Sequence, residues 1–304
     1  MVLLNMLIII VYGLVISTGP NQSLKPPEKI IKLGLSRLDG EVPVYYSEEY
    51  KTRAAYIQNL VVSASCFFKT PEILGVDADL HLAVLDSSDW TRYTKLPYGI
   101  AHIIAEPPTI IVAASADNVI VRNILAKEDK VSEITLKLLD ELEISYNEAA
   151  TTFADLISFH ELGHILANKY GCDTWPEQRW LSEFVATYLA YAYMKEKQPK
   201  LSRLWKAMMD QNACNSEVKH TTLADFETLY LGVGTDNYGW FQAKFYQKVE
   251  EIYSESGISF VHELKKLLNE NPKTSKDDIF RLKELSSISK GFSGWAEGKK
   301  GNIK

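Results

Sequence analysis

The run His160-Glu161-Leu162-Gly163-His164 constrains this chain more than any other feature of its sequence. On an α-helix, residues four apart share a face, so the two imidazoles lie one turn apart and can bind the same metal ion. Glu161 is rotated by about 100° from His160 and lies near such an ion, where its carboxylate can accept a proton. Because zinc bound in this way lowers the pKa of water toward ~7, the run predicts a catalytic zinc site.

The surrounding residues predict that this run lies on a helix from Glu148 to about Tyr170, which Gly171 ends. The two histidines belong to an apolar stripe that comprises Phe153, Leu156, Ile157, His160, His164 and Ala167. A single histidine on an inward face is most often a hydrogen-bonded core residue. Two histidines at this spacing, with a glutamate between them, favour a metal site over that interpretation.

A catalytic zinc site takes three protein ligands and leaves one position for water. Glu183 lies 19 positions after His164, within the apolar segment Trp180–Ala186. Burial of an unpaired carboxylate there would be strongly unfavourable, and a bound zinc ion would remove that penalty. The longer motif HExxHxxGxxH, which supplies a third histidine, is excluded because the corresponding positions hold Ala167 and Tyr170.

Together these residues resemble the gluzincin zinc metallopeptidases, especially the aminopeptidase family with the pattern HExxH-x18-E. That family carries a Trp-Leu-Asn-Glu-Gly segment around its third ligand, and Trp180–Phe184 is similar, with Ser182 in place of Asn and Phe184 in place of Gly. The resemblance covers about residues 153–190. The family's Gly-x-Met-x-Asn segment, which recognises a substrate amino terminus, is absent, so aminopeptidase specificity is not implied.

The resemblance implies a zincin-like α+β fold with a mixed sheet and an active-site helix, followed by a helical lobe. It implies one Zn²⁺ per chain, held by His160, His164 and Glu183, and hydrolysis of peptide bonds with Glu161 as the catalytic base. The alternative is a non-catalytic secreted or membrane-anchored binding protein that retains the zincin fold, although an intact Glu161 argues against a pure scaffold. A third possibility is a metal-dependent hydrolase that acts on a different bond.

Peptide hydrolysis also needs a hydrogen-bond donor for the oxyanion that develops on the carbonyl group. The related family uses a tyrosine at the start of a later helix, and Tyr238 holds that place here, with Tyr230 and His220 as alternatives. Histidine ligands usually donate their second N–H group to a further acceptor. Thr187, one turn after the third ligand, and Asp155, one turn before the first, are the candidates for that contact.

The order of segments predicts an exported protein with one catalytic domain. The apolar run Val2–Ser17 is typical of a signal peptide, so residues 1–19 are expected to be a cleaved signal or an N-terminal anchor, and residues 20–29 a linker. Residues 30–289 form the peptidase domain, with a strand-and-helix lobe (30–170) and a helical lobe (171–289). Residues 290–304, rich in Gly and Lys, are expected to be a flexible tail.

Within the domain, apolar runs predict strands at Ile30–Ser36, Val42–Ser47, Leu80–Asp86 and Thr109–Ser115. We expect Thr109–Ser115 to be the edge strand along which an extended substrate binds, in a cleft shared with the helix of His160. Helical spacing predicts helices at Ser47–Lys69, Ala116–Ser145, Gln178–Lys195, Leu201–Gln211, Tyr238–Ser254, Ile258–Asn269 and Ser275–Leu285.

Composition narrows the choice of partners. The formal net charge of −6 gives no indication of the basic surface that nucleic-acid binding requires, so the expected partner is a peptide or protein substrate. A membrane is a partner only if the N-terminal segment is retained, and the expected location is secreted or extracytoplasmic. Three cysteines, Cys66, Cys172 and Cys214, allow at most one disulfide within an exported chain.

Overall fold

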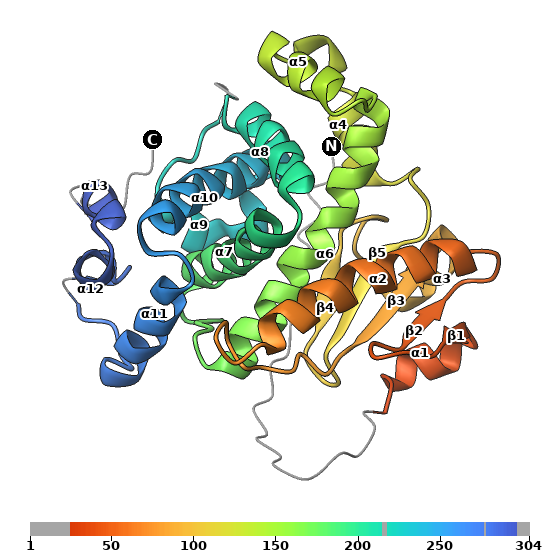
Figure 1. Cartoon of the computed structure of the whole chain (residues 1–304), viewed down its shortest axis with the longest axis horizontal. Helices are drawn as coiled ribbons and strands as arrows, with labels where there is room; N and C mark the ends of the chain where they lie inside the picture. The colour runs from red at the N-terminus through yellow and green to blue at the C-terminus, as the bar shows by residue number, and fades with distance from the viewer. Residues whose placement is uncertain (1–24, 215–217, 277, 297–304) are drawn as a thin grey trace. The chain divides into compact units, whose positions relative to one another are not determined.

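The computed structural model describes residues 25–214, 218–276 and 278–296 (Figure 1). The predicted signal or anchor segment, the first half of the predicted linker (residues 20–24) and residues 297–304 lie outside the described residues. The chain divides into two compact units. The sheet unit comprises the described residues up to Val62 together with Asp79–Asn118, and the helical unit comprises Ser63–Ala78 and the residues from Val119 onward.

The sheet unit contains one mixed five-stranded sheet. Its strands are β1 (Ser36–Leu38), β2 (Val44–Tyr46), β3 (His81–Leu85), β4 (His102–Ile104) and β5 (Thr109–Ala113), in the order β1-β2-β3-β5-β4. β2, β3 and β5 are parallel, whereas β1 and β4 pair antiparallel at the two edges. Every residue of β3 and β5 is buried, as expected for parallel strands covered on both faces.

The prediction that the strand at Thr109–Ser115 forms a sheet edge is wrong. β5 pairs with β3 on one side and with β4 on the other, so its backbone groups are occupied. The edge position belongs to β4, a three-residue strand that was not predicted from the sequence. β4 has three residues and is only half-buried, whereas β3 and β5 are longer and fully buried. Its sequence therefore has no continuous apolar run from which a strand could be predicted.

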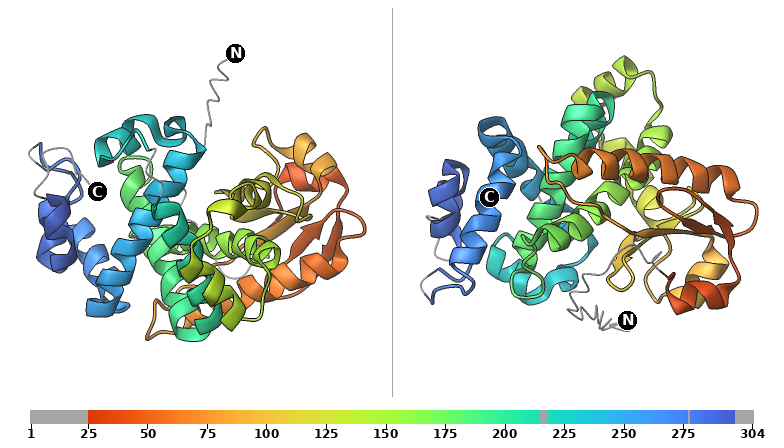
Figure 2. Two further views of the ribbon diagram at one scale, coloured as in Figure 1. Left: turned by 90° about the horizontal axis from the view of Figure 1, so that it is seen from above. Right: turned by 60° about the horizontal axis from the view of Figure 1, so that its bottom comes forward.

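Three helices accompany the sheet, with α2 (Lys51–Lys69) along one face and α1 (Glu28–Leu33) and α3 (Ser87–Tyr93) on the other (Figure 2). The predicted strand at Ile30–Ser36 is wrong over its first part, which forms α1. Glu28 and Lys32 form an i,i+4 ion pair, and Gly34, at φ 69°, caps the helix end. The core on this face comprises Ile30, Tyr45, Ala83, Leu85, Trp90, Tyr93, Ile111 and Ala113.

The helical unit consists, in its described residues, of the C-terminal end of α2 and the α-helices that follow the sheet. These are α4 (Val119–Leu125), α5 (Glu133–Glu141), α6 (Tyr146–Tyr170), α7 (Arg179–Lys197), α8 (Pro199–Ala213), α9 (Leu223–Leu229), α10 (Thr235–Ser256), α11 (Ser259–Glu270), α12 (Leu282–Ile288) and α13 (Ser293–Ala296). The predicted active-site helix α6 thus belongs to this unit rather than to the lobe that holds the strands. No helix in the described ranges is long and apolar enough to span a bilayer.

Three predictions in this unit are wrong over part of their length. Among the described residues, the helix expected at Ser275–Leu285 begins only at Leu282, as α12. The single helix expected at Ala116–Ser145 is broken into α4, a 3₁₀ turn and α5, because Ser132 accepts a hydrogen bond from the backbone N–H of Thr135 and starts a new helix. The tail expected to be flexible from residue 290 is ordered as far as α13. There Phe292 and Trp295 are buried and contact the ring of Trp180.

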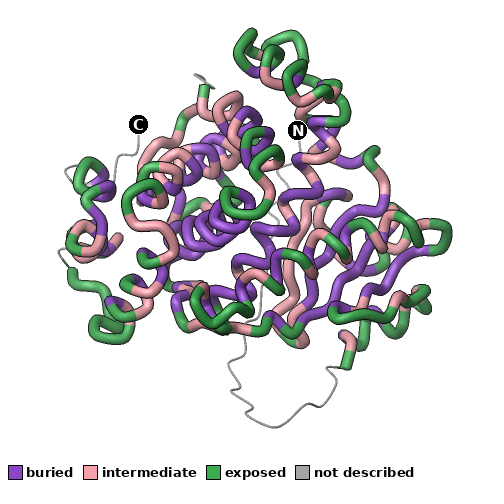
Figure 3. Tube along the Cα trace, viewed as in Figure 1, coloured by how far each residue is buried: buried purple, intermediate pink, exposed green. Residues whose placement is uncertain are grey.

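α7 is the central helix of the helical unit. Every residue from Trp180 to Met194 is buried, and α7 contacts α6, α8, α9 and α10 (Figures 1 and 3). The three cysteines are free thiols, of which only Cys172 is buried. α6 and α7 make the most extensive helix–helix contact among the described residues, and the candidate site lies on that contact.

Candidate metal centre

Local sequence signals fix the position of α6 and therefore of its two histidines. Ser145 accepts a hydrogen bond from the backbone N–H of Glu148, and the Glu148 carboxylate accepts one from the backbone N–H of Ser145, which is a complete capping box. At the other end, Gly171 adopts the left-handed conformation (φ 85°) that ends helices. The predicted helix is confirmed, with a start two residues earlier than expected.

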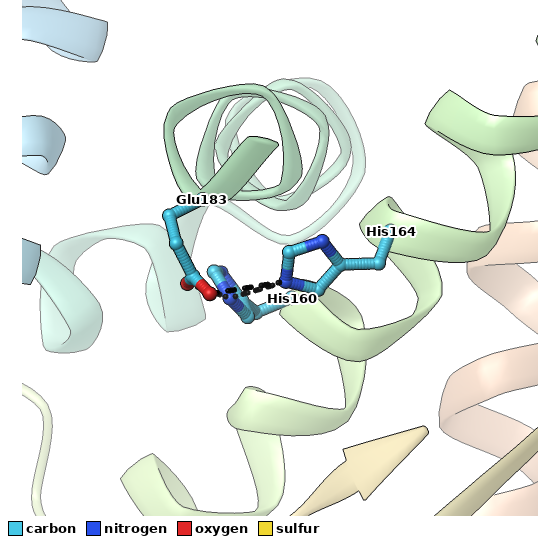
Figure 4. A group of neighbouring side chains, drawn as sticks. All are labelled: His160, His164 and Glu183. Carbon is cyan, nitrogen blue, oxygen red and sulfur yellow. Dashed lines mark hydrogen bonds and ion pairs between the residues drawn. The ribbon is translucent and has the colours of Figure 1, made fainter. Parts of the chain in front are cut away.

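His160 and His164 from α6 converge with Glu183 from α7 on one point (Figure 4). His160 Nε2 lies 3.1 Å from His164 Nε2 and 3.1 Å from Glu183 Oε2. His164 Nε2 lies 3.8 Å from Glu183 Oε1. The structure therefore brings together the three residues that were predicted from the sequence as metal ligands.

Gly163 allows this convergence because it lies where the backbones of α6 and α7 meet. A Cβ atom at this position would lie only 2.5 Å from the carbonyl oxygen of Ala186, well inside ordinary contact distance. Only glycine lets the two helices approach so closely. The glycine within the His-Glu-Leu-Gly-His run thus sets the separation between the two histidines and Glu183.

The three converging side chains are electrostatically coupled. Burial alone would raise the pKa of Glu183, but the hydrogen bond with His160, the charges of both histidines and the hydroxyl of Tyr230 hold it well below its usual range. Burial also lowers the pKa of His160, yet Glu183 and Glu161 outweigh it and raise that pKa. For His164, burial prevails and the pKa falls. The Glu183 carboxylate is therefore ionised.

Glu161 is buried next to the cluster and is not one of the three converging residues. Burial raises the pKa of its carboxyl to about 8, and the neighbouring charge of Glu183 acts in the same direction, whereas His160 opposes it. A carboxyl group whose pKa lies near neutrality exchanges protons readily at working pH. At neutral pH the Glu161 carboxyl therefore keeps its proton, and a cation beside it would lower that pKa and free the carboxylate to act as a base.

A hydroxyl group lies close to the Nδ1 atom of each imidazole ring. Thr187 Oγ1 lies 3.2 Å from His160 Nδ1, as predicted from the sequence, and Ser182 Oγ lies 3.4 Å from His164 Nδ1. Ser182 in turn donates a hydrogen bond of 2.7 Å to Asp173, in the loop after α6. Asp155, the other candidate, is buried, and its backbone carbonyl accepts a hydrogen bond from Ser158.

Two further side chains hold the Glu183 carboxylate. The Tyr230 hydroxyl donates to Oε1 at 2.6 Å, and Gln242 Nε2, from α10, donates to Oε2 at 2.8 Å. Tyr230 adopts φ 49° and ψ −117°, a strained conformation for a residue other than glycine. Each carboxylate oxygen of Glu183 therefore has its own donor.

The tyrosine predicted as oxyanion donor, Tyr238, lies beside Tyr230, with ring centroids 5.8 Å apart. Burial, together with the charges of Glu183 and Glu161, raises the pKa of Tyr238 well above its ordinary value, so its hydroxyl keeps its proton. Tyr238 is partly exposed. His220, the other alternative, is directed elsewhere: its Nδ1 lies 3.8 Å from a carboxylate oxygen of Asp225.

Gln242 and Asp173 were not predicted from the sequence. Both reach the site only through tertiary contacts, one from α10 and one from the loop between α6 and α7, at positions that have no fixed spacing from the histidines. Ser182 offered a signal in the sequence, because it lies immediately before Glu183, where the metallopeptidases that this segment resembles have Asn. A hydroxyl at that position can bridge an imidazole and a carboxylate, whereas no pattern in the sequence marks Gln242.

Comparisons with protein-family models, with curated proteins and with solved structures find no significant match for this chain. The assignment of the site therefore depends on the geometry of its residues and on the motif that they form.

Proposed function

We propose that this chain is a zinc-dependent hydrolase of peptide bonds. The observation that carries the proposal is the convergence of His160, His164 and Glu183, with the Glu161 carboxyl adjacent to them. Neutral imidazole nitrogens and a carboxylate oxygen are the ligand set of catalytic zinc sites, in which one coordination position stays open. All three ligand atoms lie within 4.8 Å of one another.

The separations between these atoms fit zinc. With bonds of roughly 2.0–2.2 Å in tetrahedral geometry, two ligand atoms lie about 3.3–3.6 Å apart. His160 Nε2 lies 3.1 Å from both His164 Nε2 and Glu183 Oε2, slightly less than that value, and His164 Nε2 lies 3.8 Å from the other carboxylate oxygen, Oε1, slightly more than it. Calcium and magnesium prefer sites made of oxygen ligands, so two imidazoles favour zinc over either ion.

When bound here, zinc would lower the pKa of water toward ~7 and polarise a substrate carbonyl group. Glu161 would accept a proton from water as the water oxygen bonds to the carbonyl carbon of the substrate. It would then pass that proton to the leaving amine as the C–N bond breaks. Glu161 ionises more readily once a cation occupies the neighbouring cluster. We assign the oxyanion contact to Tyr238, because the Tyr230 proton is already donated to Glu183.

A pair of matched variants tests this function. Glu161→Gln keeps the shape of the side chain but removes the proton acceptor, so it should retain zinc and lose peptide hydrolysis by ~10²–10⁴-fold. Glu148→Gln on the same helix is the control, because Gln preserves a capping box, and its activity should match the wild type. The assay is digestion of a broad peptide library with mass-spectrometric detection.

Two results would count against the proposal. If the zinc-loaded wild type cleaves no peptide in the library, the alternative of a non-catalytic binding protein is favoured. If Glu161→Gln cleaves as fast as the wild type, Glu161 is not the base.

We also propose that the protein is exported, on the basis of the apolar segment Val2–Ser17. The mature chain should then begin near residues 18–24. N-terminal sequencing of the protein from its native host measures this directly, and an intracellular protein that starts at Met1 would contradict it.

A further inference from the structure

We propose that two separate hydrogen-bond relays position His160 and His164 to bind metal through Nε2, and that Gln242 is a positioning residue that couples His160 to Glu183. This inference rests on the proposed function, since it concerns the same metal site. It adds that Thr187 and Gln242 affect zinc affinity as one unit, and that Ser182 and Asp173 do so as a second, independent unit.

The first relay stands behind His164 and begins at Asp173. A carboxylate only accepts hydrogen bonds, and Asp173 Oδ1 accepts from Ser182 at 2.7 Å and from the backbone N–H groups of Thr174 and Trp175. Because the single hydroxyl proton of Ser182 is donated to Asp173, its oxygen can only accept from His164 Nδ1, 3.4 Å away. His164 therefore carries its proton on Nδ1, and its Nε2 lone pair is free.

The second relay stands behind His160 and begins at Glu183. The amide nitrogen of Gln242 must face the acceptor-only carboxylate, at 2.8 Å, so its amide oxygen faces Thr187. The Thr187 hydroxyl donates to that oxygen over 3.5 Å, and its own oxygen then accepts from His160 Nδ1 at 3.2 Å. In the structure, Nε2 of His160 donates to the ionised carboxylate of Glu183 at 3.1 Å; a metal ion would replace that proton, while Nδ1 keeps its contact with Thr187.

The two relays differ in one respect. The Gln242 relay closes a ring, because the carboxylate oxygen at which it begins lies 3.1 Å from Nε2 of the histidine at which it ends. Removal of the Gln242 amide therefore disturbs two ligands, His160 and Glu183. The Asp173 relay reaches only His164. Thr187 and Gln242 should behave as one energetic unit, and Ser182 and Asp173 as another.

Both relays leave the same arrangement at the centre of the site. Nε2 of each histidine and the ionised carboxylate of Glu183 face one point. A cation satisfies them together, as a catalytic site with preset ligands requires.

Zinc affinity, measured by competition with a chromophoric chelator, tests the relays. Thr187→Val, Gln242→Leu and Ser182→Ala should each weaken zinc binding by ~10–100-fold, the usual effect of removing a hydrogen-bond partner behind a metal ligand. The double variant Thr187→Val/Gln242→Leu should be no more than about 3-fold weaker than the weaker single variant, because both changes break one relay. Gln242→Leu/Ser182→Ala should show the product of the two single effects, ~10²–10⁴-fold. Thr187→Ser keeps the hydroxyl and should restore the affinity of the wild type.

A second measurement follows the outer hydrogen bonds directly. ¹⁵N–¹H correlation spectra of the zinc-loaded protein report the Nδ1–H group of each histidine and its exchange with solvent. Gln242→Leu should speed exchange of the His160 Nδ1 proton and leave that of His164 unchanged. Circular dichroism confirms that each variant is folded.

The outcomes separate this inference from the proposed function. Multiplicative effects for Thr187 and Gln242, or faster Nδ1 exchange at both histidines in Gln242→Leu, would overturn the relays whether or not a peptide is cleaved. If the affinities and exchange rates follow the expected pattern but no peptide is cleaved, the relays stand and the hydrolytic function fails. A folded wild type that binds no zinc overturns both.

Discussion

Gly163→Ala is the substitution whose effect the structure specifies most closely. The new Cβ atom would lie 2.5 Å from the carbonyl oxygen of Ala186, whereas ordinary contact begins at 3.4 Å. The difference, 3.4 − 2.5 = 0.9 Å, is the distance by which α6 and α7 must separate along this line. Plausible metal sites keep their ligand distances within about 0.2 Å, so such a shift moves Glu183 out of bonding range of an ion held by the histidines.

Stability and zinc binding should respond very differently. Overpacking costs about 1–3 kcal/mol, and the better helix propensity of alanine returns about 1 kcal/mol, which leaves a net destabilisation of roughly 0–2 kcal/mol. Zinc affinity should fall by at least ~100-fold, because the substitution displaces a metal ligand itself and not merely a group that supports one. Urea unfolding measures the first quantity, and chelator competition measures the second.

Gly239→Ala is the matched control. Gly239 also lies within a helix, α10, but a Cβ atom there meets nothing closer than Asn212 at 3.8 Å. This variant should gain up to about 1 kcal/mol of stability and bind zinc as the wild type does. If folded Gly163→Ala binds zinc with unchanged affinity, the close approach of α6 and α7 does not set the ligand geometry, and the reasoning is refuted.

Three further predictions follow from the same site. Tyr238→Phe should retain zinc and fold but lose ~10²–10³-fold in kcat, and unchanged turnover would remove it from the mechanism. Tyr230→Phe removes one donor from Glu183 and should weaken zinc binding by ~10–100-fold in chelator competition, whereas an unaltered affinity would show that the hydrogen bond is dispensable. Zinc affinity should decline as pH falls, because metal binds neutral imidazole. The decline should begin above the ordinary histidine pKa of 6.5, since Glu183 and Glu161 raise the pKa of His160 against the effect of burial. Titration of bound zinc against pH checks this, and an affinity that stays constant down to pH ~5 would contradict it.

The parts of the fold that could be predicted from the sequence are those specified by local signals. α6 has a capping box at its start and a glycine at its end, and β3 and β5 are continuous apolar runs. α1 was predicted as a strand because a short apolar run such as Ile30–Leu33 fits both periodicities. The i,i+4 ion pair of Glu28 with Lys32 and the cap at Gly34 favour a helix over a strand.

The residues of the candidate site also fall into those that local sequence signals predict and those that depend on tertiary packing. His160 and His164 lie on one helix at fixed spacing, so their shared face follows from helical geometry alone. Glu183 could be inferred because an apolar helix contains one carboxylate that burial would otherwise disfavour. Gln242 could not be inferred, because its contact with Glu183 depends on how α10 packs against α7, which no local pattern encodes.

The zinc content of the purified protein tests the central claim most directly. After reconstitution and removal of excess metal, elemental analysis should find about one zinc per chain in the wild type. Glu183→Ala should lose most of that zinc. Glu196→Ala, an exposed position on the same helix, should keep it. A folded wild type that retains no zinc would contradict the account, because the three converging ligands would then have no metal to bind.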